Sequence, residues 1–220
     1  INLEFNVEES QRIFVSKINI FGNNVTKENV IRNQLELDEG DPFNKILATK
    51  SINNIKNLNF FKSVDLEIVD LDEGSKEINI AVQEKPTGEI TAGAGVGTSG
   101  GTIGFGVKEN NYLGNGVKLD ANMTISEDSI KGLFSVKNPN YKNTGKSLST
   151  SIEATELNKL TDFGYKTSKT GFSVGAGFEY YKDLNLSLGL NSFYESIEAD
   201  STASTRQKNQ AGNYFDTFVN

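Results

Sequence analysis

The sequence predicts two fold classes in one chain: an α+β module of β-α-α-β-β order, then an antiparallel all-β region. Three observations support this prediction. In the first region, apolar residues recur every three or four positions in two segments, which indicates helices. In the second region, apolar and polar residues alternate in about seven segments, which indicates strands. Glycines stand inside these segments rather than between them, which is typical of barrel strands.

The first region is expected to open with a strand at 14–21, followed by the turn signal Gly22-Asn23-Asn24. Thr26 is the expected N-cap of a first helix, because its hydroxyl could accept a hydrogen bond from the first helical turn. The apolar stripe of that helix holds Val30, Ile31 and Leu35.

After a break at 40–42, a second helix is expected at about 44–58, with its apolar residues three and four positions apart. The spacing of apolar residues then changes to every second position. This change predicts strands around 64–69 and 78–83, joined by a turn at 72–74. Two helices on one face of a small sheet would give a compact module of about 70 residues.

The second region is expected to form about seven strands, each with one apolar face and one polar or glycine face. They lie at 90–97, 103–108, 117–125, 134–137, 148–154, 172–179 and 184–191. A soluble sandwich would alternate in the same way, because its apolar face packs against a second layer. The regularity over seven strands favours lipid as the partner of the apolar face, and therefore an incomplete transmembrane barrel.

The lengths of the connections agree with an outer-membrane orientation. If the first strand runs outward, the outer loops are 98–101, 126–130, 156–170 and everything after 194, and the inner turns are 110–116, 138–147 and 181–183. The two longest connections are then on the outer side, as in outer-membrane barrels. Four tyrosines near the inner ends form either an interfacial girdle or ordinary turn aromatics: Tyr112, Tyr141, Tyr180 and Tyr181.

Composition excludes several classes of function. The chain of 220 residues has no cysteine and no histidine, which removes zinc sites, thiol nucleophiles and a histidine general base. Its net charge of -7 argues against nucleic-acid binding, which needs a basic surface. Its paired carboxylates lie in expected turns without a nucleophile. We therefore expect no enzyme activity, no cofactor and no metal.

No apolar run of about 18 residues is present, so no transmembrane helix is expected. No signal peptide is visible, because the chain opens on what reads as a strand at 1–7. The chain is therefore expected to be a fragment whose export signal lies upstream.

Residues 95–100 match the pattern G-x-G-x-x-G, which in dinucleotide-binding proteins opens a helix that faces a pyrophosphate. Here the next segment, 102–107, alternates like a strand. A glycine-rich hairpin is therefore the expected structure.

Short stretches along the chain carry a family resemblance. They are 15–23 and 59–65 in the first region, then 82–88, 93–98, 111–116 and Asn138-Pro139. In these stretches the chain resembles the Omp85 superfamily and, within it, the BamA family, the central subunit of the Gram-negative outer-membrane β-barrel assembly machinery. The resemblance covers roughly residues 1–194. It is most specific at 82–116, where a POTRA domain would join the first barrel strand.

This resemblance implies a fragment of a larger protein. Residues 1–12 would end a preceding POTRA domain, 13–86 would form the last POTRA domain, and 87–220 would form the N-terminal portion of a sixteen-stranded barrel. The tail 195–220 matches little, and would be a variable outer loop and the start of the next strand. The POTRA domain would lie in the periplasm and the barrel in the cell outer membrane, in contact with lipid.

The resemblance also implies a function: folding and inserting unfolded client β-barrel proteins, without ATP. The first strand would be one side of a lateral seam that admits client strands, with Gly93, Ala94, Gly95, Val96 and Gly97 as its central residues. Alternatively, the glycines only make room inside the barrel. Glu39 stands where the family has an acidic residue that contacts the accessory lipoprotein BamD, although a solvated turn carboxylate or part of a cation loop with Asp38 and Asp41 are the other interpretations.

Two rival functions remain open at this point. One is a secretion or translocation pore of the same superfamily, either a two-partner secretion transporter or a TamA-like protein. The other is a soluble two-domain enzyme or adhesin, which would require the second region to fold in water.

Overall fold

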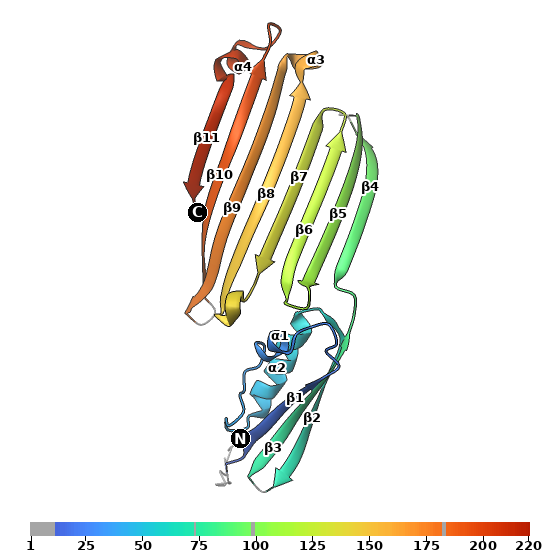
Figure 1. Ribbon diagram of the computed structural model, residues 1–220, viewed down its shortest axis with the longest axis vertical. Helices are drawn as coiled ribbons and strands as arrows, with labels where there is room; N and C mark the ends of the chain where they lie inside the picture. Colours follow the sequence, from blue (N-terminus) through green and yellow to red (C-terminus); the bar gives the residue numbers. More distant parts are fainter. Residues whose placement is uncertain (1–11, 73, 98–99, 182–183) are drawn as a thin grey trace, which may run out of the picture. The chain divides into compact units, whose positions relative to one another are not determined.

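The computed structural model describes residues 12–72, 74–97, 100–181 and 184–220. The chain divides into two compact units, residues 1–86 and residues 87–220, which we call the α+β unit and the β-sheet unit (Figure 1). The strand expected at 1–7 lies outside the described residues.

The α+β unit has the expected β-α-α-β-β order. Its elements are β1 (Phe14–Phe21), α1 (Glu28–Arg32), α2 (Lys45–Asn57), β2 (Phe61–Asp72) and β3 (Ser75–Glu84). The three strands form one sheet in the order β1-β3-β2, with β1 parallel and β2 antiparallel to β3. The last strand in sequence therefore lies at the centre of the sheet, and β1 and β2 form its edges.

The two helices differ in how well their starts were predicted. Helix α2 begins as expected at Asn44, whose side chain accepts hydrogen bonds from the backbone N–H groups of Ile46 and Leu47. The expected cap of α1 is wrong: the helix starts later, after Lys27, and no side chain caps it. Thr26 is instead buried, and its backbone N–H donates to the carboxylate of Glu84 in β3. Glu84 thereby binds the loop before α1, and Thr26 is part of that loop rather than the cap of the helix.

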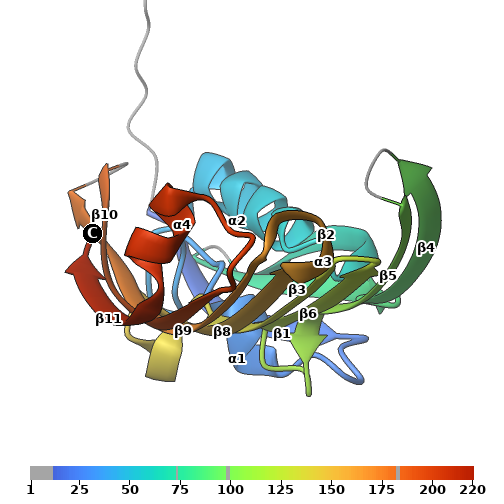
Figure 2. The same ribbon diagram turned by 90° about the horizontal axis from the view of Figure 1, so that it is seen from above.

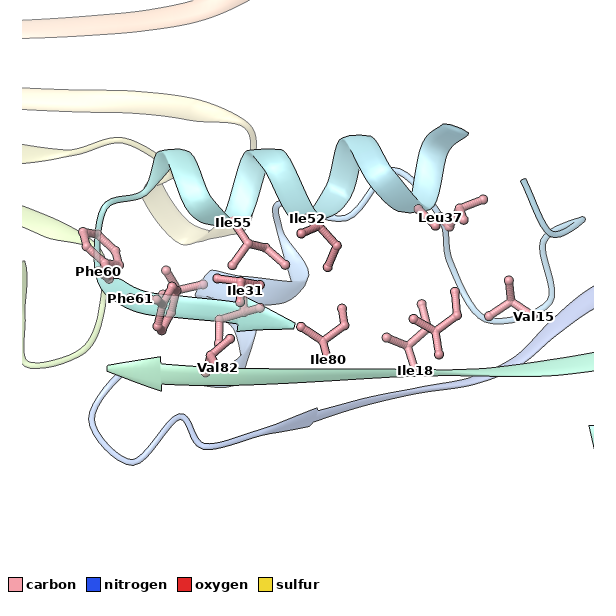
Figure 3. Close-up of a cluster of buried hydrophobic side chains, with 14 residues drawn as sticks. Val15, Ile18, Ile31, Leu37, Ile52, Ile55, Phe60, Phe61, Ile80 and Val82 are labelled. Atoms are coloured by element: carbon pink, nitrogen blue, oxygen red, sulfur yellow. The ribbon is translucent and has the colours of Figure 1, made fainter. Parts of the chain in front are cut away.

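The core of the α+β unit lies between α2 and the sheet, where Figure 3 shows side chains of helix and strands facing one another. A register shift between Val15 and Lys17 in β1 lets Val15 and Ile18 both face this core, although they are three positions apart. The buried apolar residues are Val15, Ile18, Val30, Ile31, Leu37, Ala48, Ile52, Ile55, Phe60, Phe61, Val64, Ile78, Ile80 and Val82.

The β-sheet unit is a single antiparallel sheet of eight strands. The strands are β4 (Gly88–Gly97), β5 (Gly100–Tyr112), β6 (Val117–Ser126), β7 (Ser129–Asn138), β8 (Lys146–Lys159), β9 (Tyr165–Tyr181), β10 (Leu184–Ala199) and β11 (Gly212–Val219). Each strand pairs with its neighbour in sequence, so β4 and β11 are the edges. Seen from above, the sheet curves into a trough with β4 at one rim and β10 and β11 at the other (Figure 2).

Short helices complete the connections: η1 (Tyr141–Asn143) between β7 and β8, α3 (Leu160–Phe163) between β8 and β9, and α4 (Thr205–Gln210) between β10 and β11. In the part of the chain that the structure describes, no helix is long and apolar enough to cross a membrane.

The sheet contains one strand more than the seven expected, and several strands are longer. The expected loop at 156–170 is wrong, because β8 continues to Lys159 and β9 starts at Tyr165. The tail after 194 likewise completes β10 and supplies β11. The reason is that residues such as Glu156, Asn158 and Lys166 are polar where an apolar face would be expected, yet their backbones stay paired. The alternation of apolar and polar residues shows which face of a strand is apolar. The backbone of a strand can pair with its neighbour without that alternation.

The register confirms that the apolar positions share one face. Directly opposed residues lie on the same face of an antiparallel sheet, and Ile90 faces Val107, Ile103 faces Ile125, Phe134 faces Ile152 and Leu190 faces Val174. Exposed apolar residues in this face occur in all eight strands: Ile90, Val96, Phe105, Met123, Phe134, Ile152, Phe172, Leu188 and Phe215. A surface of this kind requires an apolar partner such as lipid.

Candidate seam and docking sites

The strand that holds Gly93 to Gly97 is the edge strand β4, which among the described residues pairs only with β5. All ten of its residues are exposed. Ala94 and Val96 lie on the apolar face, and Gly93, Gly95 and Gly97 lie on the opposite, polar face. The sequence therefore placed these five residues on the correct strand, and the sheet topology places that strand at a rim.

Between Gly93 and Gly97, the hairpin formed by β4 and β5 has almost no side chains on its polar face. Gly93 is opposite Gly104, Gly95 is opposite Thr102, and Gly97 is opposite Gly100. Contacts between side chains on opposed strands are a main source of sheet stability. Without them the hairpin is held mainly by its backbone hydrogen bonds, and glycine adds a further entropic cost.

Steric need does not explain the three glycines of β4. A Cβ atom added at any of them would meet no atom of the described chain within 4 Å. Gly106 is different, because its Cβ would lie 2.6 Å from the hydroxyl of Thr91 and 2.7 Å from the amide oxygen of Asn122. Within the described residues, no neighbouring side chain uses the space that the three β4 glycines leave, whereas Gly106 makes room for Thr91 and Asn122.

The G-x-G-x-x-G pattern does not open a helix. Gly100 starts strand β5, which continues to Tyr112. A pyrophosphate site of the dinucleotide-binding type needs a helix N-terminus at that point, so the expected glycine-rich hairpin is the structure found. Residues 98 and 99 of the pattern lie outside the described residues.

Glu39 lies between α1 and α2, and its carboxylate contacts the outer edge of β1. Its Oε1 accepts a hydrogen bond of 3.0 Å from the backbone N–H of Ile18, and it lies 3.6 Å from Nη1 of Arg32. Arg32 also donates through Nη2 to the carbonyl oxygen of Ile18 at 2.9 Å. The carboxylate of Glu39 and the guanidinium of Arg32 therefore hydrogen-bond to the backbone N–H and carbonyl groups of Ile18 at the outer edge of β1. The side chain of Glu39 still keeps 47% of its surface exposed.

The acidic turn beside Glu39 is held by its own hydrogen bonds. Asp41 accepts from the backbone N–H of Asp38 at 2.9 Å, and Gly40 donates to the carbonyl oxygen of Val15 at 2.7 Å. Within the described ranges, no group of three or more acidic residues is arranged to hold a metal ion.

Glu84, at the end of β3, is a positioning residue that the sequence did not single out. Its carboxylate accepts hydrogen bonds from the backbone N–H groups of Asn24 and Val25 at 2.9 Å each and of Thr26 at 2.6 Å. These donors lie about 60 positions away in the sequence, so no local pattern could reveal them. The carboxylate thereby fixes the connection between β1 and α1.

This environment changes the acidity of Glu84. Partial burial alone would raise its pKa, but hydrogen bonds from the side chain and backbone of Thr26 and from the backbone of Val25 and Asn24 outweigh burial and lower the pKa below its ordinary value. The ionised form is therefore bound more strongly in the folded state than in the unfolded state.

Glu84→Gln is expected to lower the free energy of unfolding of the α+β unit by about 1–2 kcal/mol at neutral pH. Because the folded pKa is lowered, the stabilisation is present in full above the unfolded pKa and is lost as the pH falls through the folded one. Urea unfolding at neutral and acidic pH would measure this, with the exposed Glu67→Gln as control. A difference between variant and wild type that does not shrink in acid would contradict the assignment.

The connection between the units is held on both sides of Pro86. Lys85 donates through its backbone to the carbonyl oxygen of Phe60 at 3.0 Å and through Nζ to Asn59 at 2.6 Å, inside the α+β unit. Thr87 donates through its hydroxyl to Glu109 at 2.5 Å, inside the β-sheet unit. Pro86 alone stands between the two anchored residues.

The four tyrosines singled out in the sequence lie where strands of the β-sheet unit turn. Tyr112 ends β5, Tyr141 starts η1, and Tyr180 and Tyr181 end β9 (Figure 1). All four are exposed. Their membership of an interfacial girdle stays a prediction.

Family comparisons match both units. The POTRA family, described as "Surface antigen variable number repeat", matches residues 13–85. The Omp85 superfamily domain matches residues 111–220, which is half of the chain.

Similar proteins agree with these matches. The outer membrane protein assembly factor BamA of Neorickettsia risticii (strain Illinois) is 27% identical over 214 residues, which are 96% of this chain and 29% of that protein. The protein of the same name from Neisseria meningitidis serogroup B is 26% identical over 151 residues, 67% of this chain and 19% of that protein. The chain thus spans less than a third of the length of these curated relatives.

Solved structures share the fold. The crystal structure of BamA from Haemophilus ducreyi lacking POTRA domains 1–3 superimposes with a TM-score of 0.74 at 24% identity, over 96% of this chain and 43% of that one. CdiB from Escherichia coli gives a TM-score of 0.57 at 13% identity, over 95% of this chain and 39% of that one. The predicted fold class, an α+β module followed by part of an antiparallel barrel, is therefore confirmed.

Proposed function

Because the chain belongs to the Omp85 superfamily, we propose that it is part of an outer-membrane protein assembly factor that folds and inserts client β-barrel proteins. The β-sheet unit is then the outer-membrane portion, and the α+β unit is a POTRA domain in the periplasm. The relatives named as assembly factors cover both units, and the N. risticii protein covers 96% of the chain.

The observation that supports this proposal most directly is the edge strand β4. Strand addition to an open edge uses backbone hydrogen bonds, so it can accept many different client sequences. An edge-strand segment whose polar face is made of glycines offers its backbone with little steric restriction, and it gives up its existing pairing at low cost. The row of glycines in β4, opposed by further glycines in β5, meets both requirements.

The proposed reaction is not enzymatic. It forms and exchanges backbone hydrogen bonds, and the driving free energy comes from the folding of the client and the burial of its apolar face in lipid. No cofactor is needed for these steps. The proposal also gives the exposed apolar face of the β-sheet unit its partner, the membrane lipid.

The α+β unit would dock an accessory lipoprotein such as BamD through Glu39. The half-exposed carboxylate is fixed in place by Ile18 and Arg32, and a fixed charged group loses less conformational entropy on binding than a mobile one. This is an inference from position and geometry, and it is separable from the role of β4.

Valine at Gly93, Gly95 and Gly97 together tests the seam. Valine favours strands and restricts the backbone, and each position has open space in the described chain, so we expect a folded protein with a stiffer, more tightly paired β4. In cells depleted of the native protein, this variant should fail to restore the levels of outer-membrane proteins. The matched control is Gly132→Val in the central strand β7, which also has open space and should restore them.

Normal outer-membrane protein levels after depletion of the native protein would contradict the assembly function. The rival function, a secretion or translocation pore of the same superfamily, predicts that result, with only a secreted passenger lost. Full rescue by the triple valine variant would contradict the seam and leave assembly itself standing.

A further inference from the structure

Two lysines oppose each other on the polar face of the β-sheet unit. Lys118 of β6 is the direct cross-strand partner of Lys137 of β7, and both are exposed. Like charges in directly opposed positions destabilise an antiparallel pair. The arrangement therefore costs stability unless an anion compensates it.

The neighbouring charges leave this pair unneutralised. Asp120 lies two positions along β6, but its carboxylate is 3.6 Å from Nζ of Lys108, which is also opposite Glu89 of β4. On the other side of Lys137, the opposed residue in β8 is Ser149. This corner of the described sheet thus holds three lysines against two carboxylates, in a chain whose net charge is -7.

A polar groove begins at Lys137 and crosses the next strands. It is lined by Lys137, by Ser147 and Ser149 of β8, by Ser173, Gly175 and Gly177 of β9, and by Ser187, Gly189 and Asn191 of β10. The hydroxyls of Ser149 and Ser147 donate to the carbonyl oxygens of Gly175 and Gly177 at 3.3 and 3.4 Å. No long side chain therefore projects from the floor of the groove at these positions, because the glycines have no side chain and the serine hydroxyls hydrogen-bond to the backbone.

We propose that Lys118, Lys137 and this groove bind an acidic, extended segment of the client polypeptide. The ammonium groups would pair with aspartate or glutamate side chains, and the hydroxyl oxygens of Ser147 and Ser149, whose protons are donated to Gly177 and Gly175, would accept hydrogen bonds from the client backbone. The two lysines lie near the start of β6 and the end of β7, at the sheet end expected to face the periplasm, where a client arrives. This inference rests on the proposed assembly function.

The test uses the intact protein in detergent and two short fluorescent peptides, one alternating aspartate with serine and one with asparagine in place of aspartate. Binding is followed by fluorescence anisotropy. We expect the aspartate peptide to bind, the asparagine peptide to bind about tenfold more weakly or worse, and the affinity for the aspartate peptide to fall as salt is raised.

The decisive variant is Lys118→Gln with Lys137→Gln. It should lose about tenfold or more in affinity for the aspartate peptide. The control is Lys131→Gln, which lies in the same strand as Lys137 and on the same face, opposite Thr124 and Thr155, and should bind as the wild type does. Because the double variant removes a like-charge pair, its thermal unfolding temperature should equal or exceed that of the wild type, which separates a lost site from a lost fold.

Equal binding of the two peptides, or unchanged binding by the double lysine variant, would overturn the proposal. The valine variant of β4 should keep full affinity for the aspartate peptide. The seam hypothesis is tested by the levels of assembled outer-membrane proteins in cells, and the lysine site is tested by the affinity for the aspartate peptide. The failure of one hypothesis is therefore distinguishable from the failure of the other.

Discussion

Gly22→Ala is expected to destabilise the α+β unit by about 3–5 kcal/mol, because a backbone clash adds to conformational strain. Gly22 has a φ of +86°, which disfavours any residue with a side chain, and an added Cβ would lie 2.0 Å from the carbonyl oxygen of Val82. That carbonyl belongs to β3, the central strand, so neither partner can move without disturbing the sheet.

Urea unfolding of the α+β unit measures this effect, and the matched control is Gly40→Ala. Gly40 has a similar φ of +95° but open space around the position of a Cβ, so it should lose only the conformational term of about 1–2 kcal/mol. Equal losses for the two variants would show that the close approach to Val82 has no energetic consequence.

Ile55→Ala is expected to lower the stability of the same unit by about 2–5 kcal/mol, since it removes buried methyl groups and leaves a cavity. Ile55 is fully buried on the inner face of α2, beneath which the side chains of the strands lie (Figure 3). Its loss should also broaden the unfolding transition if the remaining core becomes less uniquely packed.

The control for this change lies in the same helix. Ile46 is 78% exposed, so Ile46→Ala should change the stability by no more than about 0.5 kcal/mol. Thermal or urea unfolding of both variants checks the pair. Similar losses at the two positions would mean that α2 does not pack on the sheet through the face described.

The sequence predicted the helices and strands whose bounds are determined by residues close to them in the sequence. Helix α2 has an apolar stripe and a capping asparagine, and β1 to β3 alternate around turn residues, so their bounds were close to those found. The start of α1 was wrong because Thr26 is held in the preceding loop by Glu84, which is far away in sequence, and the helix begins only after Lys27.

The strands that extend beyond their expected bounds were mispredicted for a different reason. Beyond Ala154 the outer face of β8 becomes polar, and the sequence loses its alternation while the hydrogen-bonded pairing with β9 continues to Lys159. Strand β11 lies in the tail that was expected to hold the start of the next strand, and its apolar residues do not alternate cleanly, because Phe215 and Val219 lie on one face and Tyr214 and Phe218 on the other. Periodicity can detect an apolar environment, but it cannot detect pairing outside that environment.

The candidate sites divide in the same way. The glycines of β4 could be identified from pattern and resemblance, because their spacing is a local property. The opposition of Lys118 and Lys137 depends on register between two strands, and the contact of Glu39 with the edge of β1 depends on how the α+β unit folds. Neither of these two arrangements can be predicted from the sequence without knowing which separate segments of the chain pair.

The anchoring around Pro86 has a mechanical consequence. Proline fixes its own φ near −65° and restricts the residue before it, so few backbone torsions remain between the hydrogen bonds of Lys85 and those of Thr87. A long flexible tether would leave many torsions free between two hydrogen-bonded residues. Here a single residue, Pro86, separates Lys85, which is bonded within the α+β unit, from Thr87, which is bonded within the β-sheet unit.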